Sequence, residues 1–128
     1  MLKLMLLAAS VLLLSGEAHA QDAAAGQKTF NQCRSCHQVG ATAKNGAGPT
    51  LNGLFGRSAG SIAGYAYSDA NKNSHLVWTE ETFAEYIKNP RAKMPGTKMA
   101  FAGLKDDAVI AGLTTYLKAF AADGTTAP

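Results

Sequence analysis

Apolar side chains recur at helical spacing near the C-terminal end of the chain, in DDAVIAGLTTYLKAF (residues 106–120). Positions three and four apart share one face of a helix, so the pattern predicts a helix with one apolar face. The residues on that face are Val109, Ile110, Leu113, Tyr116, Leu117 and Phe120. The stretch that follows, ADGTTAP, is predicted to be a frayed tail.

Capping residues mark further helices. In TEETFAEYIKN, Thr79 is the predicted N-cap, and two glutamates follow in the first turn, where the helix dipole favours negative charge. This helix is expected to end before Pro90. A shorter helix is predicted in SDANKN, capped by Ser68. Another is predicted to start at about Asp22, its cap, and to run through the two cysteines.

The first twenty residues follow a different pattern. Lys3 gives a positive start, an apolar run extends over residues 4–14, and Ala18-His19-Ala20 is an A-x-A cleavage site. This is the pattern of a secretory signal peptide, and its apolar run is too short to span a bilayer. We therefore predict a cleaved signal peptide over residues 1–20 and one domain over residues 21–128. The alternatives are a membrane anchor or the first helix of the domain.

Composition agrees with one small domain. The 128 residues carry a net charge of +3, far from the clustered basic surface that nucleic-acid binding requires. This mild basicity suits a soluble protein that meets acidic surfaces. Because 13 residues are glycines, the chain has few apolar side chains to fill a core. This leaves room at the centre for a group other than side chains.

The two cysteines, Cys33 and Cys36, are followed at once by His37 in NQCRSCHQVG. Secretion would favour a disulfide between them. A thioredoxin-like redox pair needs a surrounding βαβ pattern, which the sequence lacks. A closed zinc site needs four ligands, and His75 is the one further candidate in the domain. The fourth interpretation is covalent haem attachment, for which C-x-x-C-H is the recognised signature.

Helical geometry favours the haem. Positions three and four apart share a helix face, so both sulfurs and the imidazole would converge on one edge of a porphyrin. Two thioethers use both thiols, which explains why the chain needs no further cysteine. We predict one haem c, bound covalently through Cys33 and Cys36, with His37 as an axial ligand of its iron.

An electron carrier needs a second axial ligand, and a thioether is a suitable soft donor. Met94, Met99 and His75 are the candidates. Both methionines lie in or beside the irregular loop KMPGTKMAFAG, and methionine more often fills a core. His75 sits in a polar loop and is expected at the surface. The pattern alone leaves the choice between Met94 and Met99 open.

Beyond these motifs the chain resembles class I c-type cytochromes, specifically the mitochondrial cytochrome c group and its close bacterial relatives. The likeness covers nearly all of the domain. The matching stretches are GQKTFNQCRSCHQVG, GAGPTLNGLFGRSAG, YAYSDANKNSHLVWTEETFAEYIKNPRAKMPGTKMAFAGLKDD and LTTYLK.

The resemblance implies an all-α fold wrapped around one haem, with the first and last helices crossing where Gly26 permits close approach. It assigns the distal ligand to Met99 and leaves Met94 a packing role. It assigns the carbonyl of Pro49 as the acceptor that orients His37.

The resemblance also assigns the surroundings of the haem. The residues that match positions bonded to the propionates are Arg57, Tyr67, Asn71 and Trp78. Those that match a network beside the methionine sulfur are Tyr86, Thr97 and Asn71. Phe101 completes the set of predicted haem contacts.

For function, the resemblance implies a periplasmic, monomeric one-electron carrier between membrane-associated redox complexes of a respiratory or photosynthetic chain, with no nucleic-acid partner and no stable membrane insertion. With His/Met ligation its iron would cycle between Fe(III) and Fe(II). Because both axial positions would be filled, no coordination site would be open to a substrate. We therefore predict that the protein is not an enzyme. The alternative is a haem-based peroxidase or gas sensor with a labile distal ligand, and a thiol–disulfide oxidoreductase comes third.

The resemblance further implies docking on acidic partner surfaces through basic residues around the exposed haem edge. The chain keeps Lys28, Arg91, Lys98 and Lys105 there. Eukaryotic members carry a richer ring of lysines, and this chain has Gln32, Ala92 and Asp106 at positions that are often basic. We therefore expect weaker docking than in those members.

Overall fold

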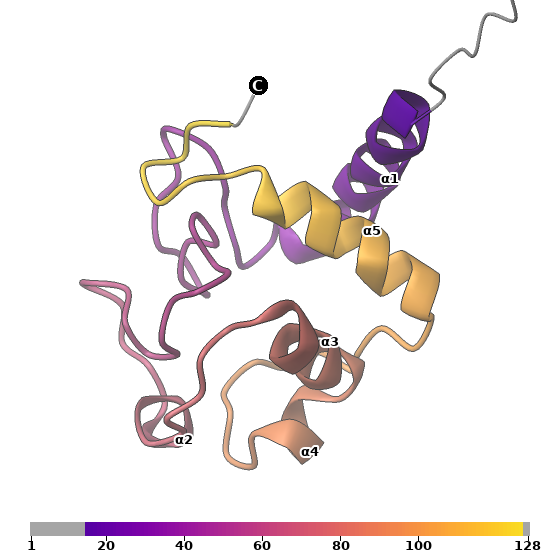
Figure 1. The fold of residues 1–128 in the computed structure, drawn as a ribbon. Helices are drawn as coiled ribbons and strands as arrows, with labels where there is room; N and C mark the ends of the chain where they lie inside the picture. The colour runs from indigo at the N-terminus through magenta and orange to yellow at the C-terminus, as the bar shows by residue number, and fades with distance from the viewer. Residues whose placement is uncertain (1–14, 127–128) are drawn as a thin grey trace, which may run out of the picture.

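The computed structural model describes residues 15–126, with side chains from residue 22 on, and confirms the all-α expectation. The α-helices are α1 (Ser15–Phe30), α2 (Asp69–Lys72), α3 (Glu80–Lys88), α4 (Pro90–Lys93) and α5 (Asp107–Lys118), and a 3-10 turn (Asn31–Cys33) follows α1. Within residues 15–126 there is no sheet, only two isolated bridges. Long loops join α1 to α3 and surround α2 (Figure 1).

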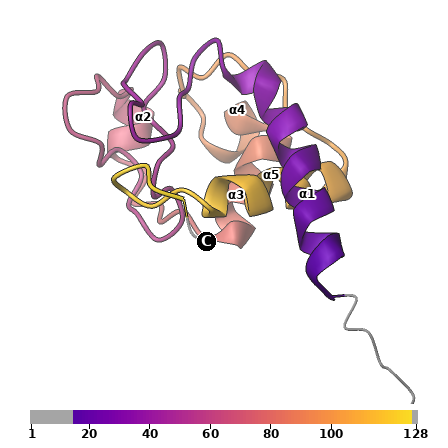
Figure 2. The ribbon, with the colours of Figure 1, turned by 90° about the horizontal axis from the view of Figure 1, so that it is seen from above.

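Helices α1 and α5 cross and form the largest contact between elements (Figure 2). Two glycines meet at the crossing: a Cβ on Gly26 would lie 2.0 Å from the carbonyl oxygen of Gly112. On the next turn the rings of Phe30 and Tyr116 pack with centroids 5.5 Å apart. The expected crossing is therefore present, and Gly112 shares with Gly26 the role of permitting it.

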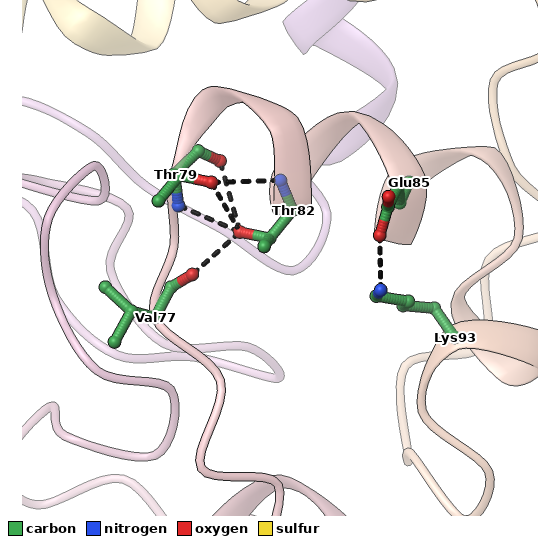
Figure 3. A network of polar contacts seen from close by, with 5 residues as sticks. All are labelled: Val77, Thr79, Thr82, Glu85 and Lys93. Atoms are coloured by element: carbon green, nitrogen blue, oxygen red, sulfur yellow. Dashed lines mark hydrogen bonds and ion pairs between the residues drawn. The ribbon is translucent and has the colours of Figure 1, made fainter.

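The caps predicted for α2 and α3 are confirmed. Ser68 Oγ accepts from the backbone N–H of Asn71, and Thr79 Oγ1 accepts from that of Thr82. Thr82 returns a bond, since its Oγ1 accepts from the backbone N–H of Thr79 over 2.8 Å (Figure 3). Threonine thus fills the place that glutamate or glutamine more often takes in a capping box.

Helix α3 ends before Pro90, as predicted, but the proline starts another helix. Asn89 caps it by accepting from Ala92 N–H, and Pro90 occupies the first position, where its missing N–H costs nothing. Glu85 of α3 and Lys93 of α4 form an ion pair that joins the two helices (Figure 3).

The prediction for α1 is wrong at both ends. Asp22 lies inside α1 and is not its cap, because the helix extends back to Ser15 through residues that include good helix formers. At the other end, α1 stops at Phe30, before the cysteines. The rest of the predicted signal peptide, residues 1–14, lies outside the described residues.

The prediction of a frayed C-terminal tail is also wrong over the described part. After α5 the chain forms a closed turn, in which Ala121 N–H donates to Thr125 O over 2.9 Å and Gly124 N–H to Ala121 O over 2.8 Å. Phe120 and Thr126 form an isolated bridge across it. Glycine at position 124, with φ of 82°, permits this turn.

The buried core gathers beside the α1–α5 crossing and under α3. Its members are Phe30, Leu54, Trp78, Phe83, Tyr86, Ile87, Met94, Ile110, Leu113 and Leu117. Among residues 15–126, none of the helices has the length and apolar character needed to cross a membrane.

Candidate haem-binding site

A cavity of about 440 Å³ lies at the centre of the fold. Its walls come from the turn after α1, the loops on either side of α2, helix α3, the loop before α5, and α5 itself. All twelve predicted cofactor and metal residues line it. They are Cys33, Cys36, His37, Pro49, Arg57, Tyr67, Asn71, Trp78, Tyr86, Thr97, Met99 and Phe101.

One tight turn brings the cysteines and the histidine together. The backbone N–H groups of Cys36 and His37 both donate to the carbonyl of Cys33, over 3.1 and 2.9 Å. The helix has ended by then, yet this turn keeps the one-face arrangement that was expected of a helix. Neither thiol is in a disulfide. Cys33 is half-buried, and burial, with a smaller contribution from Cys36, raises the pKa of its thiol.

His37 has a fixed orientation. Its Nδ1 lies 2.8 Å from the carbonyl oxygen of Pro49, which can only accept, so Nδ1 carries the proton and donates. Nε2 is then left with a free lone pair. Burial, followed by the charge of Arg57, lowers the pKa of His37, while the bond to Pro49 opposes the shift. The neutral imidazole that results is the form that binds a metal.

Gly48 provides the space for this ring. A Cβ at Gly48 would lie 2.4 Å from Cε1 of His37 and 2.9 Å from its Nε2. Any side chain there would displace the imidazole, so the glycine before Pro49 forms a cradle for it. Sequence reasoning missed Gly48, although its place directly before the predicted acceptor was a usable signal.

The two candidate methionines have different surroundings. Met94 is 4% exposed, packs in the apolar core and does not line the cavity. Met99 lines the cavity, and its Sδ accepts a hydrogen bond from Tyr86 Oη over 3.3 Å. Thr97 Oγ1 lies 3.1 Å from Tyr86 Oη and accepts from the backbone N–H of Met99.

Arg57 lines the cavity and also binds the backbone of the loop before it. Its Nη1 and Nη2 donate to the carbonyls of Asn52 and Thr50, over 2.9 and 3.0 Å. Its Nε is buried without a protein partner. Asn71 also has a buried side-chain oxygen without a partner, and it forms no hydrogen bond to Tyr86 or to Thr97. Buried polar atoms of this kind are expected to find a partner.

The aromatic residues complete the walls. Tyr67 Oη accepts from the backbone N–H of Ile62 over 3.1 Å, and Trp78 packs edge-on against Tyr86 with centroids 5.0 Å apart. Tyr65, which sequence reasoning missed, donates to the carbonyl of Ala47 over 2.7 Å and also lines the cavity. Its position two residues before Tyr67 could have indicated it.

The alternatives for the cysteine motif find no support in these contacts. Among the residues whose side chains are described, no group of three His, Cys, Asp or Glu side chains, the cysteine motif included, is arranged so that it could hold a metal ion. His75 is exposed, as expected.

Comparison with known proteins decides the family. The model of the family described as Cytochrome c matches residues 23–120. The chain belongs to the cytochrome c family. It is similar to "Cytochrome c2" of Blastochloris viridis, with 58% identity over 95% of this chain and 93% of that protein. It is 57% identical to "Cytochrome c-550" of Bradyrhizobium diazoefficiens over 80% of this chain and 75% of that protein.

A solved structure agrees with the fold of this cytochrome c. "Cytochrome cH from Methylobacterium extorquens" superposes with a TM-score of 0.72 at 45% identity, over 76% of this chain and 97% of that one. The resemblance noted in the sequence to class I c-type cytochromes is confirmed, and with it the covalently attached haem c. A cytochrome c of this kind is a monohaem electron carrier and not an enzyme.

The residues of this cytochrome c fit the haem. Two thiols and one oriented neutral imidazole face a single cavity, and Gly48 leaves the imidazole its space. The free N–H at Nε of Arg57 is a donor of the kind that a propionate would accept. On this geometry, thioethers would form at Cys33 and Cys36.

Proposed function

We propose that His37 and Met99 are the two axial ligands, and that the protein is a periplasmic one-electron carrier between membrane-associated redox complexes. The observation that carries the ligand assignment is the contrast between the methionines. Met99 lines the cavity that His37 also lines, whereas Met94 is buried in the core away from it. When bound, the haem supplies a one-electron Fe(III)/Fe(II) couple, which His/Met ligation poises at high potential.

The surrounding residues have separate tasks in this proposal. His37 is oriented by Pro49, while Tyr86 holds the sulfur of Met99. Arg57, Tyr67, Asn71 and Trp78 would bind or neutralise the propionates, and Phe101 would pack on the haem. Trp78 and Tyr86 are 7% and 6% exposed, so these two side chains keep water out of their part of the cavity. A dry, preorganised site needs little rearrangement when its charge changes by one electron.

Docking on acidic partners is proposed for the four basic residues named from the sequence. Lys28, Arg91, Lys98 and Lys105 are exposed, and none of them has a carboxylate within ion-pair distance among the described side chains. Lys98 also lines the cavity, donating to the carbonyl of Ala66 and lying 4.5 Å from the ring centroid of Tyr65. Its charge therefore sits at the haem site itself.

Four other lysines are already neutralised within the protein. Lys72, Lys88, Lys93 and Lys118 pair with Asp69, Asp107, Glu85 and Glu80. Asp106, at a position that is often basic in eukaryotic members, caps α5 by accepting from two backbone N–H groups. These ion pairs reduce the unpaired basic charge at the surface, which supports the expectation of weaker docking.

Secretion is part of the proposal. The signal-peptide pattern of residues 1–20 and the relatives named cytochrome c2 and cytochrome c-550 support a periplasmic location. N-terminal sequencing of the secreted protein should find Gln21 first. We also expect a monomer, which sedimentation would show.

The function itself is tested on the purified holoprotein by redox titration and by exposure to carbon monoxide. We expect a single reversible one-electron transition and no carbon monoxide adduct at neutral pH, because both axial positions are filled. Tight carbon monoxide binding by the unmutated protein would replace the carrier with a gas sensor or peroxidase.

A further inference from the structure

The C-terminal turn (residues 121–126) lies beyond the region that the cytochrome c family model matches, which ends at residue 120. The turn closes on itself through Asp123, whose Oδ1 accepts from both the backbone N–H and the hydroxyl of Thr125, over 3.0 and 2.7 Å. All of its residues except Gly124 are exposed. It therefore buries little apolar surface, and its role must come from its backbone contacts.

Those contacts are with the loop that follows the cysteine motif, beside which the yellow C-terminal segment lies in Figure 1. Gly124 packs so closely that a Cβ on it would lie 2.1 Å from the carbonyl oxygen of Gly40. A Cβ on Gly53 would lie 2.9 Å from Cα of Ala122, and the N–H of Gly53 donates to Phe120 O over 3.0 Å. The turn thus contacts the loop at two glycines.

The side chain of Asn52 also binds Gly40. It is 8% exposed, and its side-chain amide forms two bonds to one residue: Nδ2 donates to Gly40 O and Oδ1 accepts from Gly40 N–H, both over 2.9 Å. Gly40 is therefore held between Asn52 on one side and Gly124 on the other. The carbonyl of Asn52 in turn accepts from Arg57.

The loop held in this way contains the acceptor of the histidine. Pro49 and Thr50 lie between Gly40 and Asn52, and Leu51 N–H donates to Gln38 O over 3.1 Å, next to His37. If the C-terminal turn were absent, Gly40 would lose its contact with Gly124 and Gly53 its contact with Ala122, and the Pro49 carbonyl would be freer to move away from His37.

We propose that the C-terminal turn positions the histidine ligand of the haem, with Gly124 and Asn52 as the positioning residues. The turn fixes Gly40, Gly40 fixes Asn52, and the loop then presents the Pro49 carbonyl to Nδ1 of His37. This inference rests on the proposed ligation by His37.

The test measures how fast the Nδ1 proton of His37 exchanges with solvent, by NMR of the ferrous holoprotein with labelled histidine. In Gly124→Ala the new Cβ collides with Gly40, and in a chain ending at Phe120 the turn is absent. The control is Gly56→Ala, where φ is also positive, at 96°, but a Cβ meets nothing within 4 Å. The backbone amide of Leu117 in α5 reports global opening.

We expect exchange of the His37 proton to be roughly tenfold faster in Gly124→Ala and in the shortened chain, with Leu117 unchanged, because local opening is cheaper than global unfolding. Gly56→Ala should behave as wild type. Unchanged His37 exchange in Gly124→Ala would overturn the inference, even if the shortened chain fails to fold. So would equal acceleration at Leu117, or in Gly56→Ala.

The same spectra separate this inference from the proposed function. A ligating imidazole has ring protons strongly shifted by the haem. If the unmutated protein lacks those shifts at His37, the ligation proposal fails. If the shifts are present and Gly124→Ala leaves the exchange rate unchanged, only the role of the C-terminal turn is lost.

Discussion

The hydroxyl of Tyr86 donates a hydrogen bond to the sulfur of Met99 over 3.3 Å. A thioether sulfur has two lone pairs, so one can accept this bond while the other is available to iron. The Thr97 hydroxyl, 3.1 Å from Tyr86 Oη, is free to donate to it. The bond therefore orients the sulfur without competing for the coordinating lone pair, and it draws electron density away from the sulfur.

Replacing Tyr86 with phenylalanine should lower the reduction potential. Without the bond the sulfur donates more strongly to iron and favours Fe(III). A hydrogen bond contributes on the order of 1 kcal/mol, and about 1.4 kcal/mol corresponds to about 59 mV for one electron, so a fall of some tens of millivolts is expected. Tyr116→Phe, whose ring lies outside the cavity, is the control and should leave the potential unchanged. A rise in Tyr86→Phe would contradict the role of the bond.

The difference in reduction potential between the wild type and Tyr86→Phe should not depend on pH below about 10, the usual pKa of tyrosine. Burial is the main cause that raises the pKa of Tyr86, so its hydroxyl keeps its proton and remains a donor throughout that range. Redox titrations of wild type and Tyr86→Phe at several pH values would check this. A difference that disappears between pH 7 and 9 would show that the donor is lost earlier.

Gly48→Ala should displace the imidazole of His37. The added methyl would overlap Cε1 at 2.4 Å, and overpacking of this kind typically costs about 1–3 kcal/mol. Gly46→Ala is a close control, because its Cβ would meet only Cys36 O at 3.5 Å, an ordinary contact. Thermal unfolding and the spectrum of the haem should change in Gly48→Ala alone. Equal effects in the two variants would show that the cradle does not matter.

Much of this site could be predicted from the sequence because its signals are local. The C-x-x-C-H spacing works through one turn, and that turn forms through the carbonyl of Cys33 even though α1 ends at Phe30. The N-caps Ser68 and Thr79 also act within three residues of their own positions. Met99 and Pro49 were chosen by resemblance to the family. Both line the cavity, because the loops that carry them are shared within the family.

What sequence reasoning missed depends on contacts between distant segments. Apart from its place before Pro49, Gly48 has no local pattern that shows that a Cβ there would overlap His37, eleven positions earlier. The frayed-tail prediction failed because Gly124 packs on Gly40. The end of α1 was misplaced because the chain changes to a 3-10 turn over Asn31–Cys33 directly after Phe30. Helical periodicity cannot detect any of these.

Removal of the thioethers should prevent folding. The cavity of about 440 Å³ is large for a domain whose core is thin, and without haem it would be empty or collapse. We predict that the double variant Cys33→Ala/Cys36→Ala is largely disordered by circular dichroism and amide NMR, unlike the holoprotein. A sharp, cooperative melting transition in the haem-free variant would show that the side chains alone specify the fold.

Electron transfer to an acidic redox partner should slow as ionic strength rises, because salt screens the docking charges with a Debye length of about 10 Å near 0.1 M. Lys28→Gln and Arg91→Gln should each reduce the rate at low salt and weaken its salt dependence. Lys118→Gln removes the same charge from a lysine already paired with Glu80, and should have less effect. Equal effects in all three variants would show that docking depends on the net charge of the protein and not on Lys28 and Arg91.

The central claim is that Met99, and not Met94, is the second axial ligand of the iron. Carbon monoxide binding to two single variants of the ferrous holoprotein tests it most directly. Met99→Ala removes the sulfur that lines the cavity, whereas Met94→Leu is a volume-conserving change in the core. We predict that Met99→Ala binds carbon monoxide at neutral pH and has a lower potential, while Met94→Leu behaves as wild type. Carbon monoxide binding in Met94→Leu together with none in Met99→Ala would contradict the ligand assignment.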